Sequence, residues 1–286
     1  MKGIILAAGK GTRLYPVTKA AVKPLLPVYD KPLIYYSVAV LLQAGIKDIL
    51  IIIPPGEEGA FRNLLGDGSF IGVNVQYAVQ YEARGIADAF IVGREFIGDD
   101  DVCLVLGDNI FYHHDFDALL KAAVTDLNGA SVFGYRVEDP RPFGVVEFDE
   151  NGKAVSIEEK PEKPKSDYII PGLYFYTNDV VDIASSLKPS ARGELEITDV
   201  NIRYMEAGKL DVVPVDRGMI WLDAGTEDSL LDAACTVKAL QKSGEYVGCI
   251  EEIAWKQGFI DDAGLREAGE NLKGTKYGRH ILSCLE

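Results

Sequence analysis

Short, almost wholly apolar runs alternate with segments of helical periodicity through the first hundred residues. The apolar runs cover residues 3–8, 48–53 and 102–106, and residues 73–79 alternate between apolar and polar side chains. Helical periodicity covers residues 32–44, 57–65 and 86–96. Continuous apolar runs are typical of strands buried on both faces, and their alternation with helices predicts a mainly parallel sheet covered by helices on both sides.

The pattern changes twice in the rest of the chain. Four strands of more antiparallel character are predicted at residues 130–137, 144–148, 154–158 and 168–176. Asn151-Gly152, between the second and third of them, is typical of a two-residue hairpin turn. From residue 228 the pattern is helical, over residues 228–243, 249–257 and 261–271.

We therefore expect an α/β protein, a Rossmann-like three-layer αβα sandwich. Its mainly parallel mixed sheet would carry an antiparallel insertion and C-terminal helices. Residues 1–227 would form the core, and residues 228–286 a helical extension for packing or oligomerisation that is not an independent domain.

Charge and cysteine content narrow the class of protein. The 286 residues include 44 acidic and 29 basic side chains, a formal net charge of -15, which argues against nucleic acid or an anionic membrane as the main partner. No apolar stretch approaches the ~20 residues of a membrane-spanning helix, and the first residues lack a signal-peptide pattern. The four cysteines are far apart and form no Cys-x-x-Cys, so we expect neither a disulfide framework nor a zinc site, and a reducing, cytoplasmic location.

The densest set of candidate chemical groups follows the first apolar run. Gly9-Lys10-Gly11 allows amide N–H groups to converge on an anion, and Arg13 and Lys23 add two cations just beyond it. Together they suit a polyphosphate. Glycines also end strands for steric reasons alone, so the glycines by themselves leave both interpretations open. The loop is neither a dinucleotide fingerprint, because Leu14 occupies the third glycine position, nor a Walker loop.

Two aspartates follow apolar runs. Asp108 comes after residues 102–106, and Asp223 ends Trp221-Leu222-Asp223. Such aspartates more often cap a helix or a turn, but ligands of parallel sheets bind at the carboxyl ends of strands, and two carboxylates are a partial ligand set for Mg²⁺.

Two further groups of charged residues can be interpreted either as ordinary surface residues or as part of a binding site. Glu159 and Lys160 belong to a charge-alternating segment that is either an exposed strand end or a binder of sugar hydroxyls and phosphate. Arg192 is by spacing an ordinary surface arginine, or else a second phosphate clamp.

The residues from Gly3 to Pro27 closely resemble the signature of sugar-1-phosphate nucleotidylyltransferases. The resemblance continues through residues 25–32, 106–109, 193–199 and 222–223, and residues 249–258 are similar to the short bacterial-type branch. It implies transfer from dTTP to glucose 1-phosphate, giving dTDP-glucose for dTDP-sugar synthesis such as that of dTDP-rhamnose, with Mg²⁺ as cofactor. It also implies a homotetramer built as a dimer of dimers, with feedback by a dTDP-sugar.

The resemblance also implies a role for individual residues. The nucleotide would be held by Leu6, Gly9, Gly11 and Thr12, its base by Gln80 and Gly85, and its triphosphate by Arg13 and Lys23. Asp108 and Asp223 would bind Mg²⁺, with Asp108 also beside the nucleotide. The sugar phosphate would be held by Lys160 and Arg192, in a pocket lined by Asn109, Gly144, Glu159, Ile170, Gly172 and Tyr174. Arg13, Lys23, Lys160, Asp108 and Asp223 would carry the catalysis.

Four positions depart from what is usual in the bacterial members. Pro24 and Asp88 stand where glutamine is common, Phe143 replaces a tyrosine, and His113 replaces a glycine near a second, regulatory nucleotide site. Base choice, sugar choice and feedback are therefore open. A uridylyltransferase or a relaxed enzyme is the alternative, because thymine and uracil offer Gln80 the same edge. A non-catalytic nucleotide-sugar sensor is disfavoured by the joint presence of metal ligands and leaving-group cations.

Overall fold

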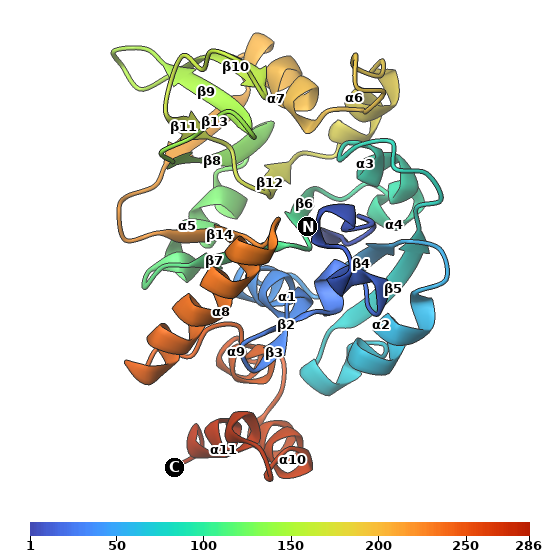
Figure 1. The fold of residues 1–286 in the computed structure, drawn as a ribbon, viewed down its shortest axis with the longest axis vertical. Helices are drawn as coiled ribbons and strands as arrows, with labels where there is room; N and C mark the ends of the chain where they lie inside the picture. Colours follow the sequence, from blue (N-terminus) through green and yellow to red (C-terminus); the bar gives the residue numbers. More distant parts are fainter.

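A ten-stranded sheet crosses the molecule between two layers of helices (Figure 1). The computed structural model describes residues 1–286. The strand order is β10-β9-β11-β8-β12-β6-β1-β4-β5, with β13 paired to β8. The strands are β1 (Lys2–Leu6), β4 (Asp48–Ile53), β5 (Asn74–Val79), β6 (Val102–Leu106), β8 (Ala130–Arg136), β9 (Gly144–Phe148), β10 (Ala154–Glu159), β11 (Tyr168–Ile169), β12 (Leu173–Tyr176) and β13 (Leu210–Pro214).

Most strands of this sheet share one direction. β5, β4, β1 and β6 are mutually parallel, β13 is parallel to β8, and β12, β11 and β10 run the opposite way. The antiparallel pairs gather in the middle third of the chain. The predicted α/β class, with a mainly parallel sheet and an antiparallel insertion, is confirmed.

The two faces of the sheet belong to two separate hydrophobic cores. In β1, Ile5 packs into one core and Ile4 into the other, and both are fully buried. The first core is completed by α1 (Ile34–Gln43), α2 (Glu58–Leu65), α5 (Phe116–Thr125) and α9 (Ile250–Lys256). The second is completed by α3 (Asp88–Val92), α4 (Arg94–Ile97), α6 (Val180–Ser186) and α7 (Ile197–Glu206). Burial on both faces explains why the central strands are apolar without alternation.

Three predicted elements differ in detail. The helix predicted at 86–96 breaks into α3 and α4 at Gly93, where a Cβ would come within 2.9 Å of Ile4. The strand predicted at 168–176 divides into β11 and β12 around Pro171, which lacks a donor for the ladder. The hairpin at Asn151-Gly152 is longer than two residues: β9 ends at residue 148, β10 begins at 154, and only Gly152 of the pair has positive φ.

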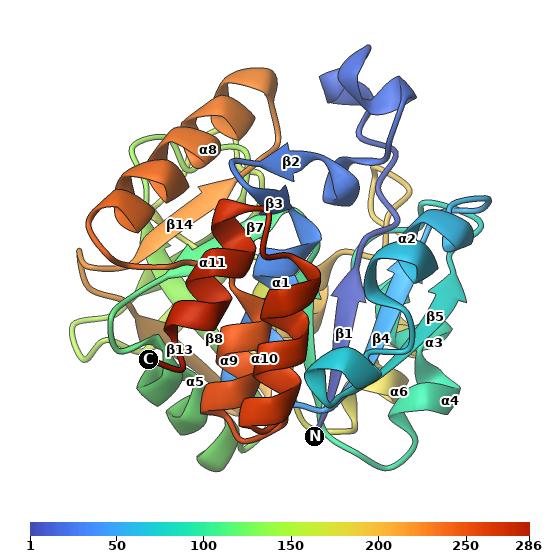
Figure 2. The same ribbon diagram turned by 90° about the horizontal axis from the view of Figure 1, so that it is seen from below.

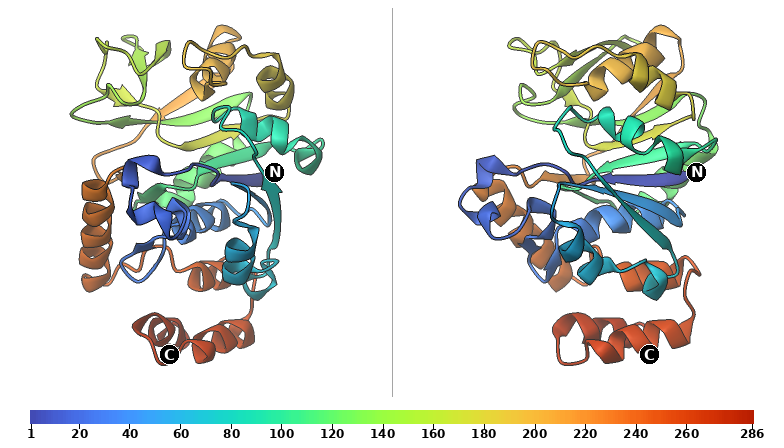
Figure 3. Two further views of the ribbon diagram at one scale, coloured as in Figure 1. Left: turned by 45° about the vertical axis from the view of Figure 1, so that its right-hand side comes forward. Right: turned by 90° about the vertical axis from the view of Figure 1, so that its right-hand side faces the viewer.

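The C-terminal helices cover one end of the molecule. α8 (Glu227–Lys242) starts with a capping box between Thr226 and Ser229 and packs on β14 (Ile220–Asp223) and β2 (Pro27–Val28). β14 pairs with β7 (Asn109–Tyr112), and β2 pairs with β3 (Lys31–Pro32). α9 packs on α1, whereas α10 (Asp262–Asn271) and α11 (Lys276–Ser283) form a hairpin at the far end from the antiparallel strands (Figure 3). None of the helices is long and apolar enough to span a membrane.

Candidate active site

The loop after β1 presents backbone and cations to a large cavity of about 770 Å³. Gly11 has φ 59° and begins a 3₁₀ turn, η1 (Thr12–Leu14), and its carbonyl accepts a hydrogen bond from the hydroxyl of Thr18 at 2.7 Å. A Cβ on Gly9 would meet no protein atom within 4 Å, so packing of the protein does not require glycine there. Lys10 and Arg13 are exposed and also line the cavity. The loop therefore leaves room for a ligand to approach its backbone beside positive charge.

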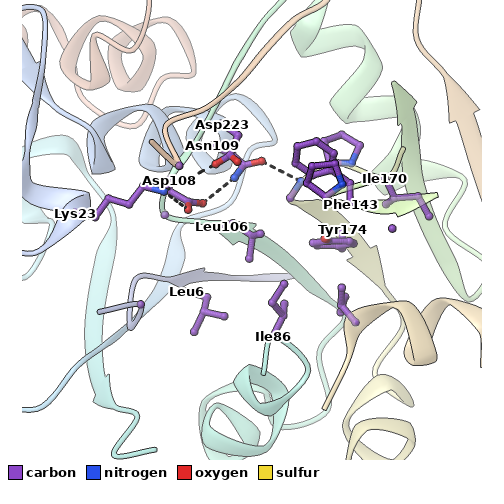
Figure 4. Close-up of a pocket in the computed structure, with 18 of the residues that line it drawn as sticks. Leu6, Lys23, Ile86, Leu106, Asp108, Asn109, Phe143, Ile170, Tyr174 and Asp223 are labelled. Atoms are coloured by element: carbon purple, nitrogen blue, oxygen red, sulfur yellow. Dashed lines mark hydrogen bonds and ion pairs between the residues drawn. The ribbon is translucent and has the colours of Figure 1, made fainter. Parts of the chain in front are cut away.

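Two aspartates meet at the middle of the cavity (Figure 4). Asp108 follows β6, as predicted. Asp223 does not follow a strand of the main sheet. It ends β14, which lies outside that sheet, and pairs with Asn109 across the β7–β14 ladder. Lys23 joins them, with its Nζ 2.6 Å from Asp108 Oδ2 and 3.9 Å from Asp223 Oδ1. Residues more than a hundred positions apart thus face one point.

The negative charges of Asp108 and Asp223 lie close enough together to affect the protonation of Asp223. Burial, and after it the negative charge of Asp108, raises the pKa of Asp223 to about 6, while Lys23, Arg13 and Lys160 act in the opposite direction. Two carboxylates that repel one another favour a cation between them. Their hard oxygen atoms suit Mg²⁺, which takes one or two protein carboxylates and completes its shell with phosphate oxygens and water. The donor set therefore fits the metal that the sequence predicted.

Asn109 fixes the position of Asp108. Its Nδ2 donates to Asp108 Oδ1 at 2.8 Å, and its Oδ1 accepts from the N–H of Gly172 at 3.1 Å and from Trp221 Nε1 at 2.6 Å (Figure 4). A Cβ on Gly172 would lie 2.6 Å from Leu106 and 2.8 Å from Asn109 Oδ1, which explains the glycine. Trp221, for which no role was predicted, is thereby part of the site.

A second group of cations lies around Glu159 at the end of β10. Arg192 Nη1 is 3.4 Å and Lys160 Nζ 3.6 Å from Glu159 Oε1. The other oxygen, Oε2, accepts from the hydroxyl of Thr198. Lys160 has φ 44°, an unusual value for a lysine, and it follows the last residue of the strand. Arg192, which spacing alone suggested to be an ordinary surface residue, lines the cavity with these groups.

The cavity gathers nearly all the residues singled out from the sequence. Those lining it are Leu6, Gly9, Gly11, Thr12, Arg13, Lys23, Asp108, Asn109, Gly144, Glu159, Lys160, Ile170, Gly172, Tyr174, Arg192 and Asp223. Gln80 and Gly85 are not among the lining residues. Gln80 is 8% exposed and its Nε2 donates to Asp88 at 2.8 Å. Gly85 has φ 103° and lies so close to the backbone of Leu195 that a Cβ would come within 2.4 Å of its carbonyl oxygen.

Some lining residues had no assigned role in the sequence analysis. One is Lys10, a cation between the two loop glycines, whose position beside Gly9 and Gly11 is a local signal for the same site. Thr198 and Asn201 reach the cavity from α7, a helix that the apolar pattern did not predict. Their contribution depends on the packing of α7 beside β10.

Comparisons with known proteins agree with this geometry. The profile of the family described as "Nucleotidyl transferase" matches residues 2–239. The glucose-1-phosphate thymidylyltransferase of Neisseria meningitidis serogroup A is 54% identical over 287 residues, covering all of both chains. That of Mycolicibacterium smegmatis is 53% identical over 287 residues, 100% of this chain and 99% of its own.

Solved structures share the fold. A Bacillus anthracis structure described as a glucose-1-phosphate thymidylyltransferase in complex with sucrose has a TM-score of 0.76 and 43% identity, covering 82% of this chain and 94% of its own. A UDP-glucose pyrophosphorylase complexed with UDP-glucose has a TM-score of 0.73 and 26% identity, covering 85% and 98%. On the profile match and the full-length relatives, the chain belongs to the nucleotidyltransferase family and, within it, to the glucose-1-phosphate thymidylyltransferases.

Proposed function

We propose that the protein transfers the thymidylyl group of dTTP to α-D-glucose 1-phosphate, giving dTDP-glucose and pyrophosphate. One observation carries the proposal. A single cavity joins the glycine loop with its cations, a pair of carboxylates, and a second pair of cations at Lys160 and Arg192. Two anionic substrates could thus bind on either side of Asp108 and Asp223. The names of the full-length relatives supply the substrate class.

Binding and charge neutralisation would carry the catalysis. The triphosphate would lie against the loop amides, Arg13 and Lys23, and the sugar phosphate against Lys160 and Arg192. A phosphate oxygen of the sugar phosphate then attacks the α-phosphorus in line, the bond to the β-phosphate breaks, and pyrophosphate leaves. The attacking oxygen is already an anion at neutral pH, so no general base is needed. Positioning and electrostatic stabilisation are the main contributions to such phosphoryl-type transfers.

Asp108 and Asp223 would hold Mg²⁺, with Asn109 fixing the carboxylate of Asp108. Bound there, the ion would supply positive charge to the triphosphate oxygens near the α-phosphorus. Lys23, whose ammonium is in contact with Asp108, already offsets part of the carboxylate charge. The same lysine is buried to 8% exposure, so its charge is held close to the cavity.

The base would be selected by the segment around Gln80. A carboxylate only accepts hydrogen bonds, so Asp88 draws the amide NH₂ of Gln80 toward itself at 2.8 Å, and Arg84 donates to the other oxygen at 2.6 Å. The Oε1 of Gln80 and its second N–H are then the groups left for a base. Uracil offers the same edge, and the similarity to a UDP-glucose pyrophosphorylase makes a UTP-using or relaxed enzyme the second candidate.

We further propose a homotetramer, a dimer of dimers, acting in the cytoplasm on the route to dTDP-rhamnose and subject to feedback by a dTDP-sugar. Support comes from the resemblance to this family. His113, at the position expected near a regulatory site, is 8% exposed with its Nε2 3.3 Å from Asp216. Light scattering of the purified protein tests the subunit number, and inhibition by dTDP-rhamnose tests the feedback.

Isotope labelling tests the chemistry directly. Glucose 1-phosphate carrying ¹⁸O in the C1–O–P bridge is incubated with dTTP, Mg²⁺ and the protein, and the products are identified by mass spectrometry and ³¹P NMR. We expect pyrophosphate and a dTDP-glucose that keeps the label, because the attacking oxygen is a non-bridging one. Release of labelled phosphate, or hydrolysis of dTTP with no nucleotide sugar formed, would refute the proposed transfer.

A further inference from the structure

Four side chains of the C-terminal extension gather away from the candidate active site. Cys249 precedes α9 as its N-cap and Glu252 lies one turn further on, while His280 lies on α11 and Cys284, one turn later, is the C-cap of that helix. The ligand atoms of Cys249, Glu252 and His280 all lie within 4.8 Å of one another. His280 Nε2 is 2.6 Å from Glu252 Oε2 and 3.9 Å from Cys284 Sγ. α11 lies beside α10 in Figure 2, and α10 in turn packs on α9.

The composition of this cluster is that of a zinc site. Two sulfurs, one imidazole and one carboxylate suit Zn²⁺, whereas Mg²⁺ and Ca²⁺ prefer oxygen atoms alone. Zinc bonds of about 2.0–2.3 Å place tetrahedral ligand atoms roughly 3.3–3.8 Å apart. The ligand atoms of Cys249, Glu252 and His280, all within 4.8 Å of one another, are near this range, and the His280–Glu252 separation is 2.6 Å. Cys284 Sγ approaches His280 at 3.9 Å but lies outside that group of three, so its side chain would have to turn toward the ion to complete the site.

The ligand spacing also fits. The cluster is Cys-x₂-Glu followed by His-x₃-Cys, and structural zinc sites commonly use Cys-x₂₋₄-Cys followed by His-x₃₋₅-His. The sequence has no paired cysteines of the Cys-x-x-Cys kind, so no zinc site was expected from it. Here the two thiols come from separate helices, and each is one turn from a ligand of another type.

Neighbouring residues orient the cluster. Lys256 Nζ holds Glu252 Oε1 at 2.6 Å, which leaves Oε2 toward His280. The ring of Tyr246 stacks on the imidazole of His280, with centroids 3.4 Å apart and planes 3° from parallel. Cys249 is fully buried, and the side chains of Glu252 and His280 are 12% and 21% exposed. A Glu252–His280 hydrogen bond alone would link the two helices, but it does not account for the two thiols close to His280.

We propose that Cys249, Glu252, His280 and Cys284 bind one Zn²⁺ per chain and thereby fasten α11 to α9. Both thiols lose their protons to solvent on binding, and His280 coordinates as the neutral imidazole through Nε2. Because α9 packs on α1 in the first core, the ion would tie the α10–α11 hairpin to the body of the protein.

The test uses the full-length protein without a polyhistidine tag, stripped with a chelator and titrated with Zn²⁺ or Co²⁺. We expect one equivalent to bind, Co²⁺ to give a thiolate-to-metal charge-transfer band, and Zn²⁺ to raise the melting temperature. His280→Gln should lower Zn²⁺ affinity by more than about 100-fold, beyond the roughly 10–100-fold typical of an outer-shell partner. Cys284→Ser should weaken the charge-transfer band.

Controls use groups outside the cluster. Cys235→Ser removes an exposed thiol on α8, and His114→Gln disrupts the other group of potential ligands, His113, His114 and Asp115; both should bind Zn²⁺ as the unaltered chain does. Cys249→Ser replaces a fully buried side chain and could fail to fold, so His280→Gln and Cys284→Ser carry the test. No stoichiometric binding, no charge-transfer band, or the same affinity in His280→Gln overturns the proposal.

Discussion

Asp223 illustrates how one side chain can serve function at the expense of stability. It lies beside Asp108, its pKa is raised to about 6, and an acid with a raised pKa stabilises the fold only while it is protonated. That contribution is complete below its ordinary value of 3.8 and is lost as the pH rises through 6. At neutral pH the metal-free protein therefore holds a repulsive carboxylate pair.

Asp223→Asn is expected to abolish most turnover and yet to stabilise the metal-free protein. In EDTA, the difference in melting temperature between the variant and the unaltered chain should grow in favour of the variant as the pH rises from about 4.5 to 7. The corresponding gain in the free energy of unfolding is about 1–2 kcal/mol. This is below the full value of the pKa shift because the side chain is 29% exposed. Asp232→Asn, at an exposed position of α8, is the matched control. A difference that does not change with pH would show that Asp223 is not held against a like charge.

Turnover in the same variant tests the metal role. With Mg²⁺, dTTP and glucose 1-phosphate, Asp223→Asn should lose at least about 100-fold in kcat, the scale of losing a group that stabilises transition-state charge. Circular dichroism would establish that the fold is retained. Near-normal activity in Mg²⁺ would refute the assignment of Asp223 as a ligand.

Lys160 should act on one substrate more than on the other. It lies beside Glu159 and Arg192, apart from the glycine loop, so Lys160→Ala is expected to raise the KM for glucose 1-phosphate at least about tenfold, the scale of a lost charged hydrogen bond, with a smaller effect on dTTP. Lys163→Ala changes an exposed lysine in the same loop and should leave both constants unchanged. Equal losses for both substrates would place Lys160 elsewhere in the mechanism.

At the scale of elements, the connection from β11 to β12 sets the position of the Asp108 carboxylate through Asn109. Gly172→Ala would bring a Cβ within 2.8 Å of Asn109 Oδ1, so Asn109 and the Asp108 carboxylate that it holds must shift. We expect a loss of about 10–100-fold in kcat, since displacements of about 1 Å in a positioned group have effects of this size. The measurement is steady-state kinetics beside a thermal melt.

Gly59→Ala is the matched control for Gly172→Ala, because an added Cβ at Gly59 would contact no other group. No atom lies within 4 Å of a Cβ built there, and the residue is inside α2. The variant should gain about 0.5–1 kcal/mol in the free energy of unfolding, because alanine is the better helix former, with unchanged activity. If both glycine variants lost activity alike, the loss could not be assigned to the position of Asn109.

The sequence predicted well the strands that are buried on both faces. It predicted poorly the short elements that are held in place by contacts with distant parts of the chain. β4 and β6 have the predicted bounds because both faces of each are apolar. By contrast α7, with the sequence ITDVNIRYME, and the short strands β13 and β14 were not predicted as elements. Short helices and strands are stabilised mainly by tertiary contacts, and those contacts do not show in a local pattern.

The same distinction holds for the site. The glycine loop, Arg13 and Lys23 lie close together in sequence, so a local motif was sufficient to find them. Arg192 and Trp221 come to the cavity only through the folding of distant segments: for Arg192 the family resemblance indicated the site while its spacing did not, and Trp221 was not assigned to it. Likewise, Gln80 and Gly85 lie outside the lining of the cavity, and their proposed contact with the base stays a prediction.

At the scale of the whole molecule, the helical extension is continuous with the core. Ile250 and Ala254 of α9 are fully buried in the first core, whereas Leu265, Tyr277 and Ile281 belong to a small separate cluster with Cys249. A chain ending at residue 260 should therefore fold, with reduced stability. A chain ending at residue 244 should lose at least about 4 kcal/mol, since each fully buried aliphatic side chain contributes about 1.5–3 kcal/mol. Urea unfolding of the two chains makes the comparison; equal stability would show that α9 is dispensable.

The most direct test of the proposed activity is pyrophosphate release from glucose 1-phosphate and Mg²⁺, with dTTP and UTP compared as donors by kcat/KM. We expect release with dTTP, favoured over UTP by about tenfold or more, which is what one methyl group in a pocket can supply. Equal values would contradict the thymidylyl assignment in favour of a relaxed enzyme. No release with either donor, while dTTP binds, would contradict nucleotidylyl transfer itself.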